Sequence, residues 1–358
     1  MEDKLINSDD VLRQNSAKTL NSSKTENCRF SEDLSSWMSC MPEELRRLPI
    51  IHLAIPGSHD SGTWPINEHS DWAPDLDSIL KKLKWLGIIV KWVTSRWSKA
   101  QDFNVLQQLE AGVRYFDLRI ATRVSKDNVR DFYIVHGLYG PPLKEVLAQI
   151  QQFLFAHPKE VVIIDCQHFY SVTTNDHDTL ATIFYDSLKD KIVQTTSSYM
   201  NNLTMNYMND NQYQVIMVYR NSQALKYNFF PSSAYPTPWP DTTNPDILCE
   251  ILTENLRTRN NNVGYVSQFI LTPVAKTILT NLFTGNLKKF SGLQLLSKKL
   301  HWVKEQTPGA RGVNVIIADF VDIQDQNFCR TVIDLNQKLL AEGDTELETP
   351  RGLPPVTN

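Results

Sequence analysis

Several common signatures are missing from this chain of 358 residues. Its five cysteines are odd in number and form no CxxC pair, and its eight histidines form no HExxH pattern, so neither a disulfide framework nor a zinc site is indicated. No GxGxxG follows a predicted strand, which disfavours a dinucleotide-binding fold. The GxSxG elbow of serine hydrolases is also absent.

Strong net charge and long apolar runs are absent too. The formal net charge is −4, which gives no general attraction to nucleic acid. No run reaches the roughly 18 uncharged apolar residues that a membrane span needs. The polar start Met1–Lys4 does not predict a secretion signal, and widely spaced cysteines are typical of free thiols in a reducing compartment. We therefore expect a cytoplasmic protein.

The composition divides the chain into one folded segment and two tails. Residues 1–35 are rich in Ser, Asn, Lys and Asp and poor in aromatic residues, which predicts a disordered polar tail. Residues 343–358 contain three prolines and predict a second tail. The segment 36–342 has the apolar content of a single globular domain.

Apolar runs that are continuous rather than alternating indicate parallel strands buried on both faces. Helical periodicity lies between several of them, as from Leu143 to Leu154, and in a last helix from Val332 to Leu340. Eight strands with intervening helices predict a TIM-type (β/α)8 barrel of the α/β class, irregular where the helices are short, with a doubly wound open sheet as the alternative. The predicted strands are Ile51–Ile55, Val113–Ile120, Phe132–Val135, Val161–Cys166, Tyr213–Tyr219, Lys226–Phe230, Gly264–Leu271 and Val313–Phe320.

Polar residues follow the first predicted strand at once. Pro56 and Gly57 are expected to end this strand, because proline has no amide hydrogen for the sheet and glycine favours turns. The next residues, Ser58–Ser61, include His59 and Asp60. In a barrel of this type, functional side chains lie on loops at the carboxyl ends of the strands. A surface turn with an incidental histidine is the alternative.

Three further predicted strands end in charged or imidazole side chains. Asp117 and Arg119 are two residues apart, so they face the same side of the second strand, as functional groups or as a structural ion pair. His136 follows the third strand and could instead be a hydrogen-bonded core residue. Asp319 follows the last strand, where it could cap a helix or, because the first and last strands of a barrel are neighbours, orient His59.

Together these residues predict acid–base chemistry on a phosphodiester. Two histidines, each with a carboxylate nearby, are the groups that a general base and a general acid need near neutral pH. An arginine between them suits the negative charge that develops on the oxygens of phosphorus. The set therefore predicts phosphodiester cleavage without a metal ion or other cofactor.

The same stretches resemble the X domain of phosphatidylinositol-specific phospholipases C, and above all the small proteins that contain little besides that domain. The resemblance runs in family order over roughly residues 36–342. It implies a TIM-type barrel and cleavage of the bond between phosphate and diacylglycerol. The matching stretches are Ile55–Gly62, Gly112–Arg119, Val135–Gly137, Glu160–Asp165, Tyr213–Arg220, Leu271–Pro273 and Asn314–Phe320.

The resemblance also implies roles for the residues at the strand ends. His59 is then the general base that takes the proton of the inositol 2-hydroxyl, and Asp319 orients it. The freed oxygen attacks phosphorus within the same molecule and yields a cyclic inositol phosphate. His136, supported by Asp60, is the general acid that protonates the departing diacylglycerol oxygen.

A metal-independent enzyme is the type that the resemblance implies. Arg119, with Asp117 in the polar network that holds it, would stabilise the pentacoordinate phosphorus. Arg119 stands where calcium-dependent relatives carry a metal-binding Asp. Asp60 replaces their Asn, and Gln167 replaces a Glu. The positive charge of Arg119 at the metal position would repel calcium. Arg220 matches a basic position that contacts inositol, with a surface arginine as the alternative.

The predicted inositol pocket departs from the bacterial pattern. Gln167 and His168 lie where bacterial enzymes carry a substrate-binding Lys, and no counterpart of their inositol-binding Asp stands near Gln268. Two hypotheses follow: a phosphoinositide phospholipase C with His168 among its substrate contacts, or a lipid-binding or scaffold barrel with weak or no turnover. A glycerophosphodiesterase would require a cluster of metal-binding acidic residues, and we find no such cluster in the sequence.

Residues 79–99 predict an amphipathic element at the rim of the barrel. Every charged residue between Asp77 and Asp102 is basic, and apolar residues recur at helical spacing from Ile79 to Trp97. Such an element could make transient contact with an anionic membrane surface. It could also pack on the barrel with its lysines in water, which we favour because its apolar content is high enough for burial.

Overall fold

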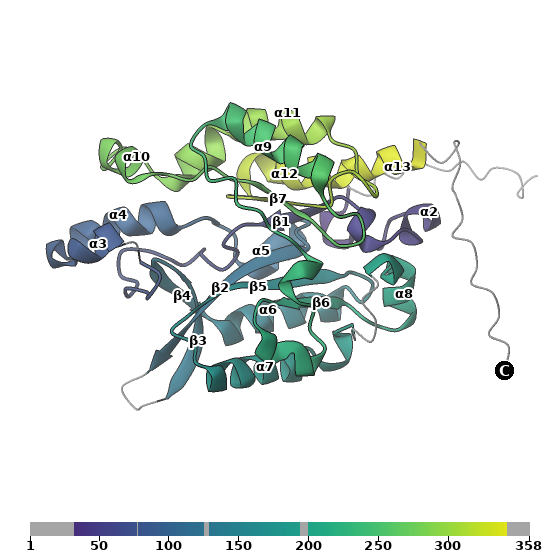
Figure 1. Cartoon of the computed structure of the whole chain (residues 1–358), viewed down its shortest axis with the longest axis horizontal. Coiled ribbons are helices and arrows are strands. Elements are labelled where there is room, and N and C mark those ends of the chain that lie inside the picture. Colours follow the sequence, from purple (N-terminus) through teal and green to yellow (C-terminus); the bar gives the residue numbers. More distant parts are fainter. Residues whose placement is uncertain (1–31, 77, 125–128, 194–199, 342–358) are drawn as a thin grey trace, which may run out of the picture.

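A computed structural model describes residues 32–76, 78–124, 129–193 and 200–341. The strands form an irregular barrel with helices packed around it (Figure 1), which confirms the predicted TIM-type fold. Six parallel strands lie in the order β6-β5-β2-β1-β8-β7. The strands are β1 (Ile55–Ser58), β2 (Tyr115–Val124), β3 (Arg130–His136), β4 (Leu138–Pro142), β5 (Val162–Tyr170), β6 (Val215–Tyr219), β7 (Val266–Phe269) and β8 (Val315–Ala318).

An irregular segment closes the barrel between β6 and β7. Phe230 donates its backbone N–H to Met217 in β6 (2.8 Å), and further along the segment Ala234 accepts from Gly264, just before β7 (2.9 Å). The prediction of a strand over Lys226–Phe230 is wrong, because Lys226 and Tyr227 end a 3-10 helix and only Phe230 bridges to β6.

A β-hairpin leaves the barrel after β2. β3 runs antiparallel to β2, and β4 runs antiparallel to β3. The prediction of a parallel third strand is wrong, because a parallel crossover needs about a dozen residues or more and the chain from Val124 to Arg130 is too short for one. His136 nevertheless ends its strand, as predicted.

The first strand begins where the prediction ends it. Ile50–His52 form a 3-10 helix, and Pro56 and Gly57 lie inside β1. Pro56 has no N–H to donate, but it lies before the first residue pair between β1 and β2, which is Gly57 and Tyr115. Proline is therefore tolerated at this position. Gly57 is needed because a Cβ there would lie 2.7 Å from a methyl group of Ile317. The histidine of the following turn still comes directly after the strand.

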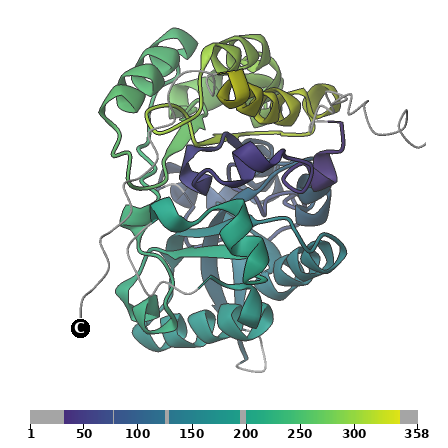
Figure 2. The ribbon, with the colours of Figure 1, turned by 90° about the vertical axis from the view of Figure 1, so that its right-hand side faces the viewer.

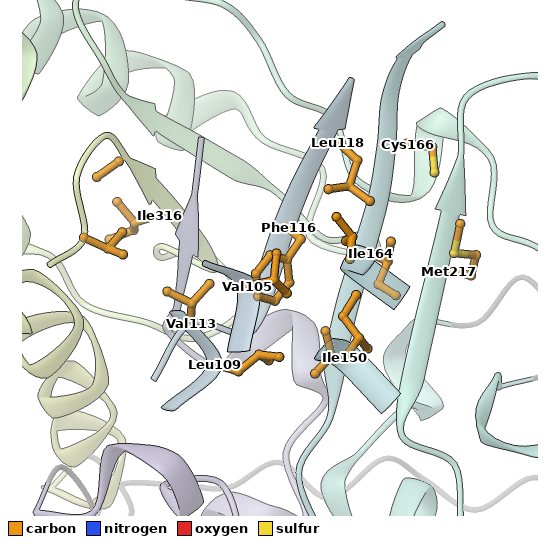
Figure 3. Close-up of a cluster of buried hydrophobic side chains, with 14 of the residues drawn as sticks. Val105, Leu109, Val113, Phe116, Leu118, Ile150, Ile164, Cys166, Met217 and Ile316 are labelled. Carbon is orange, nitrogen blue, oxygen red and sulfur yellow. The ribbon is translucent and has the colours of Figure 1, made fainter. Parts of the chain in front are cut away.

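Helices cover the outside of the barrel (Figures 1 and 2). The apolar stripe from Leu143 to Leu154 lies on α6 and is buried, as predicted. Figure 3 shows this outer core, where Phe116, Leu118 and Ile164 of the strands meet helix side chains. The helices in the described residues are α2 (Glu43–Arg46), α3 (Ser78–Lys82), α4 (Ile88–Ser98), α5 (Val105–Glu110), α6 (Leu143–Ala156), α7 (Thr174–Leu188), α8 (Met205–Asp210), α9 (Pro245–Thr258), α10 (Ala275–Thr280), α11 (Leu296–Glu305), α12 (Ile323–Asp334) and α13 (Lys338–Ala341).

The chain enters the fold slightly before the predicted boundary at residue 36. Leu34 is buried, and the buried Arg114 donates to the Ser35 carbonyl (2.7 Å) while it pairs with Glu160 (2.7 Å). The rest of the predicted N-terminal tail, residues 1–31, and the C-terminal tail, residues 343–358, lie outside the described residues. None of the described helices has the length and apolar character to span a bilayer.

Candidate active site

The acidic and imidazole side chains predicted at four strand ends lie together at the carboxyl end of the barrel. β8 pairs with β1, so Asp319 and His59 follow neighbouring strands. Asp319 Oδ1 lies 2.8 Å from His59 Nδ1, and both side chains are buried. The contact fixes the orientation of the ring, because Nδ1 is engaged and Nε2 remains for the other groups of the site.

Arg119 lies against both His59 and Asp60. Its Nε is 2.6 Å from Asp60 Oδ1, and its Nη2 is 3.1 Å from His59 Nε2. The ion-pair partner of Arg119 is therefore Asp60, whereas the spacing on β2 suggests Asp117. Burial acts to raise the pKa of Asp60, but Arg119 and the nearby imidazoles outweigh it and lower this pKa to about 2.

The protonation of His59 reflects a balance of charges. Burial acts to lower its pKa, but the carboxylates of Asp60 and Asp319 raise it to about 9. Asp60 Oδ2 and Asp117 Oδ2 lie 3.3 and 3.9 Å from Nε2. The contact with Arg119 at the same nitrogen favours the unprotonated ring. The carboxylates of Asp60 and Asp319 outweigh the guanidinium of Arg119, so the substrate-free ring is protonated at neutral pH, and a rise in pH releases Nε2 as a base.

His136 faces the same site from the end of β3. Its Nδ1 donates a hydrogen bond to the Ser98 carbonyl at the end of α4 (2.7 Å) and lies 3.3 Å from Asp60 Oδ2. The ring centres of His136 and His59 are 6.4 Å apart. Because Nδ1 is bound to the protein, Nε2 of His136 is the nitrogen that can protonate a leaving group.

The turn after β1 is held by residues that the sequence analysis missed. Asp60 has a φ of 43°, a left-handed conformation that aspartate tolerates. Ser61 Oγ accepts from the Asp117 N–H (2.9 Å), and Gln101 Nε2 donates to the His59 carbonyl (2.9 Å). No local pattern marks Gln101, because its contacts depend on the packing of distant segments.

A cavity of about 580 Å³ opens beside Arg119, toward β5 and β6. Arg220 lies in its wall, but it is bound to the buried Asp165 through Nε (2.9 Å) and Nη2 (2.7 Å). Burial and the charge of Arg119 lower the pKa of His168, so this side chain is neutral at neutral pH. The lining residues are Asp117, Arg119, Gln167, His168, Arg220, Thr237, Trp239 and Gln268.

Trp239 is a further aromatic residue of the site that the sequence analysis missed. Its ring centre lies 5.6 Å from that of His59, with the planes tilted by 31°. It borders the 580 Å³ cavity and a second cavity of about 270 Å³. A single tryptophan in a loop carries no periodic signal. The second cavity is lined by His59, Trp97, Arg119, His136, Trp239, Ile270, Leu271, Thr272, Pro273, Leu287 and Asp319.

One group of described residues could hold a metal ion by distance alone. Ligand atoms of His59, Asp60 and Asp117 lie within 4.8 Å of one another. Arg119 already places a cation within 2.6 Å of Asp60 and 3.1 Å of His59. A second cation there would be repelled, so this donor set does not suit calcium.

The segment 79–99 buries one face and exposes another. Val90, Val93 and Trp97 are buried in the protein, in agreement with the favoured packing interpretation. Trp85 is 79% exposed, however, and Ile88 and Ile89 also face solvent. Figure 1 shows α10 beside α4. Leu279 of α10 and Phe283, which follows this helix, are exposed as well. We call Trp85, Ile88, Ile89, Leu279 and Phe283 the rim patch.

Comparison with known proteins places this site in a family. A model of the phosphatidylinositol-specific phospholipase C X domain matches residues 92–221. Human PI-PLC X domain-containing protein 3 is 34% identical over 306 residues, which are 85% of this chain and 94% of that protein. The mouse PI-PLC X domain-containing protein 2 is 36% identical over 307 residues, 85% of this chain and 88% of that protein. This chain belongs to the PI-PLC X domain-containing proteins.

Solved structures of bacterial enzymes share the fold. A phosphatidylinositol-specific phospholipase C from Staphylococcus aureus superposes with a TM-score of 0.61 over 86% of this chain and 99% of its own, at 17% identity. The enzyme from Listeria monocytogenes gives a TM-score of 0.56 over 84% of this chain and 98% of its own, at 18% identity. At these identities the likeness concerns the barrel, and the chemistry of this member rests on its own residues.

Proposed function

We propose that this protein is a phosphodiesterase that cleaves phosphatidylinositol-type phospholipids into diacylglycerol and a cyclic inositol phosphate without a metal ion. The observation that carries the proposal is that two histidines approach the same carboxylate, Asp60, which is paired with Arg119. His59 Nδ1 is held by Asp319 at 2.8 Å, and His136 Nδ1 by the Ser98 carbonyl at 2.7 Å. Both rings thereby keep Nε2 as the nitrogen for proton transfer, and Arg119 lines the same cavity as both histidines.

The proposed reaction needs one proton accepted and one proton donated. His59 takes the proton of the inositol 2-hydroxyl, and that oxygen attacks phosphorus. Arg119 stabilises the charge on the non-bridging oxygens. Asp60 pairs with this guanidinium, and Asp117 accepts the Asp60 N–H in the same polar network. His136 then protonates the oxygen of the departing diacylglycerol.

The two cavities fit the two halves of such a substrate. The 580 Å³ cavity has mainly polar walls, including His168 and Arg220, and suits the head group. The 270 Å³ cavity, with Leu271, Pro273 and Leu287 in its wall, suits the glycerol and the start of a chain. The rim patch would insert into the membrane interface while the barrel stays in the cytoplasm, so the protein would bind the membrane peripherally.

A lipid-binding barrel without turnover is the second candidate. The observation in its favour is that the arginines of the head-group cavity are already paired, Arg119 with Asp60 and Arg220 with Asp165. Paired guanidiniums offer less charge to a substrate phosphate. A lipid-binding barrel would have the same fold and the same membrane contact as the proposed phosphodiesterase, but it would not cleave the lipid.

The test is purified full-length protein with vesicles that contain phosphatidylinositol, assayed for diacylglycerol and cyclic inositol phosphate. We expect both products in equal amounts. Diacylglycerol without cyclic phosphate would show direct attack by water and refute the intramolecular step. Vesicle binding with neither product would favour the lipid-binding barrel.

A further inference from the structure

A third cavity, of about 270 Å³, touches the general acid from another direction. Arg119 and His136 contribute to its wall, and α4 and the segment before α3 supply much of the rest. Its lining differs in character from one part to another: Leu76, Leu80 and Ile278 are apolar, whereas Asp75, Thr94 and Ser98 are polar. The function proposed above assigns this cavity no role.

Two of the polar groups converge on Gly137, the residue after the general acid. Asp75 Oδ2 accepts the Gly137 N–H at 2.8 Å. Ser98 Oγ lies 2.9 Å from the place where a Cβ on Gly137 would stand, and Gly137 has a φ of 69°, so glycine is required there. A carboxyl and a hydroxyl therefore flank the chain directly beside His136.

The second oxygen of Asp75 has no partner in the described part of the protein. Asp75 Oδ1 is buried and receives no hydrogen bond from the described residues. Burial raises the pKa of this carboxyl, although His136 and the Gly137 N–H act against the shift. A buried oxygen that makes no hydrogen bond is unfavourable, and a ligand hydroxyl satisfies it in either protonation state.

We propose that this cavity is a subsite for a free hydroxyl on the leaving group, so that the preferred substrates are inositol phosphodiesters whose glycerol is not acylated next to the phosphate-bearing carbon. The inference rests on the proposed function. The departing oxygen lies at His136, and the hydroxyl on the next carbon of the glycerol is placed against Asp75 and Ser98, which flank the adjacent Gly137. The Asp75 carboxyl accepts a hydrogen bond from this hydroxyl, and Ser98 Oγ donates one to its oxygen.

A second fatty chain does not fit this subsite well. It would lie against Asp75 and bury a carboxyl against hydrocarbon without a hydrogen bond, which is unfavourable. One remaining chain has a path through the cavity of Leu271 and Leu287. Two sources share the required chemistry: lysophosphatidylinositol, which keeps one chain, and glycerophosphoinositol, which has none.

The experiment compares kcat/KM for four compounds: 1-acyl lysophosphatidylinositol, its 2-deoxy analogue, glycerophosphoinositol and dihexanoyl phosphatidylinositol. We expect the lyso compound to exceed its deoxy analogue by about 10–10²-fold, the effect of one or two buried hydrogen bonds. The kcat/KM of glycerophosphoinositol would equal that of the lyso compound if the fatty chain makes no favourable contact. It would be lower if the apolar cavity binds the chain.

Three variants separate recognition from structure. Asp75→Ala should bring the ratio of lyso to deoxy compound close to one, and Asp75→Asn, which can still accept from Gly137 and from a hydroxyl, should keep part of it. Asp131→Ala, at an exposed acid on β3, should leave the ratio unchanged. If Asp75→Ala slows all substrates alike, Asp75 only positions Gly137 and the subsite is refuted.

The wild-type comparison also tests the subsite without any variant. Equal cleavage of the lyso compound and its deoxy analogue, or preference for the diacyl compound, would refute the subsite and leave the proposed function intact. Cleavage of none of the four compounds would refute the proposed function, and the subsite with it.

Discussion

Arg119 Nη2 lies 3.1 Å from His59 Nε2, the nitrogen that receives the proton in the proposed reaction. The same guanidinium lies 2.6 Å from Asp60, which also approaches His136 at 3.3 Å. One arginine thus connects the groups on both sides of the reacting phosphate.

Removal of either histidine should abolish most of the activity. We expect His59→Ala and His136→Ala each to lower kcat by about 10²–10⁴-fold, the usual contribution of a general base or acid. Circular dichroism should show an intact fold. His301→Ala is the matched control, because that side chain is 75% exposed and distant from the site. Near-normal turnover by either active-site variant would contradict the assignment.

Calcium should be dispensable for activity. We expect wild-type turnover to persist in EGTA, because Arg119 supplies the positive charge that a metal ion would otherwise provide. Arg119→Ala should lower kcat by about 10³–10⁵-fold, by analogy with arginine fingers. Arg119→Lys keeps the charge but loses the planar fork, so it should recover only part of the rate. Activity that vanishes in EGTA and returns with calcium would refute the metal-free mechanism.

Stability should depend on the ionisation of His59. Its pKa is raised from 6.5 to about 9 in the folded protein, so its protonation adds stability that is fully present below pH 6.5 and is lost as the pH rises through about 9. The difference in free energy of unfolding between wild type and His59→Gln should therefore fall by about 3 kcal/mol over this window. Urea denaturation at several pH values measures it, and a flat difference would show that Arg119 keeps the ring neutral throughout.

The same ionisation should appear in the kinetics. The base must be unprotonated in the free enzyme, so kcat/KM should rise with pH up to about pH 9, the pKa of His59. Measurement of initial rates between neutral and alkaline pH tests this limb of the profile. A limb centred below neutral pH would mean that the carboxylates do not control His59.

Arg220 should matter for stability as well as for binding. Arg220→Ala leaves Asp165, which is fully buried, without its charged partner and should cost about 3–5 kcal/mol of unfolding free energy. Asp165→Asn in the same chain should restore part of this loss, because it removes the unpaired charge. Arg257→Ala, at a side chain that is 72% exposed, is the control. An unchanged melting temperature in Arg220→Ala would show that the pair is not structural, and a raised KM alone would mark a pure binding role.

The rim patch should bind membranes. We expect Trp85→Ala and Phe283→Ala to weaken binding to anionic phosphatidylinositol vesicles, with little effect on the cleavage of a soluble short-chain substrate. Phe155→Ala on α6 removes an equally exposed aromatic ring, 87% accessible, outside the patch and should leave vesicle binding unchanged. Equal losses in all three variants in a vesicle sedimentation assay would argue against a specific docking face.

The barrel and much of the candidate site could be predicted from the sequence. Runs such as Val161–Ile164 are apolar throughout, and a chain can bury both faces of such strands only inside layers of helices. The polar residues that interrupt the strand ends then had to converge, because parallel strands bring their carboxyl ends to one rim. The contact between Asp319 and His59 follows from the neighbouring positions of the last and first strands.

Only the tertiary structure decided how the strands close and which groups pair. The hairpin of β3 and β4, the irregular segment at Phe230 and the choice of Asp60 as partner of Arg119 depend on contacts between distant parts of the chain. Residues such as Gln101 and Trp239 carry no local periodicity, so the sequence pattern could not reveal them. Local propensity and burial act along the chain, whereas an ion pair or a ring contact is set by side chains that meet only after folding.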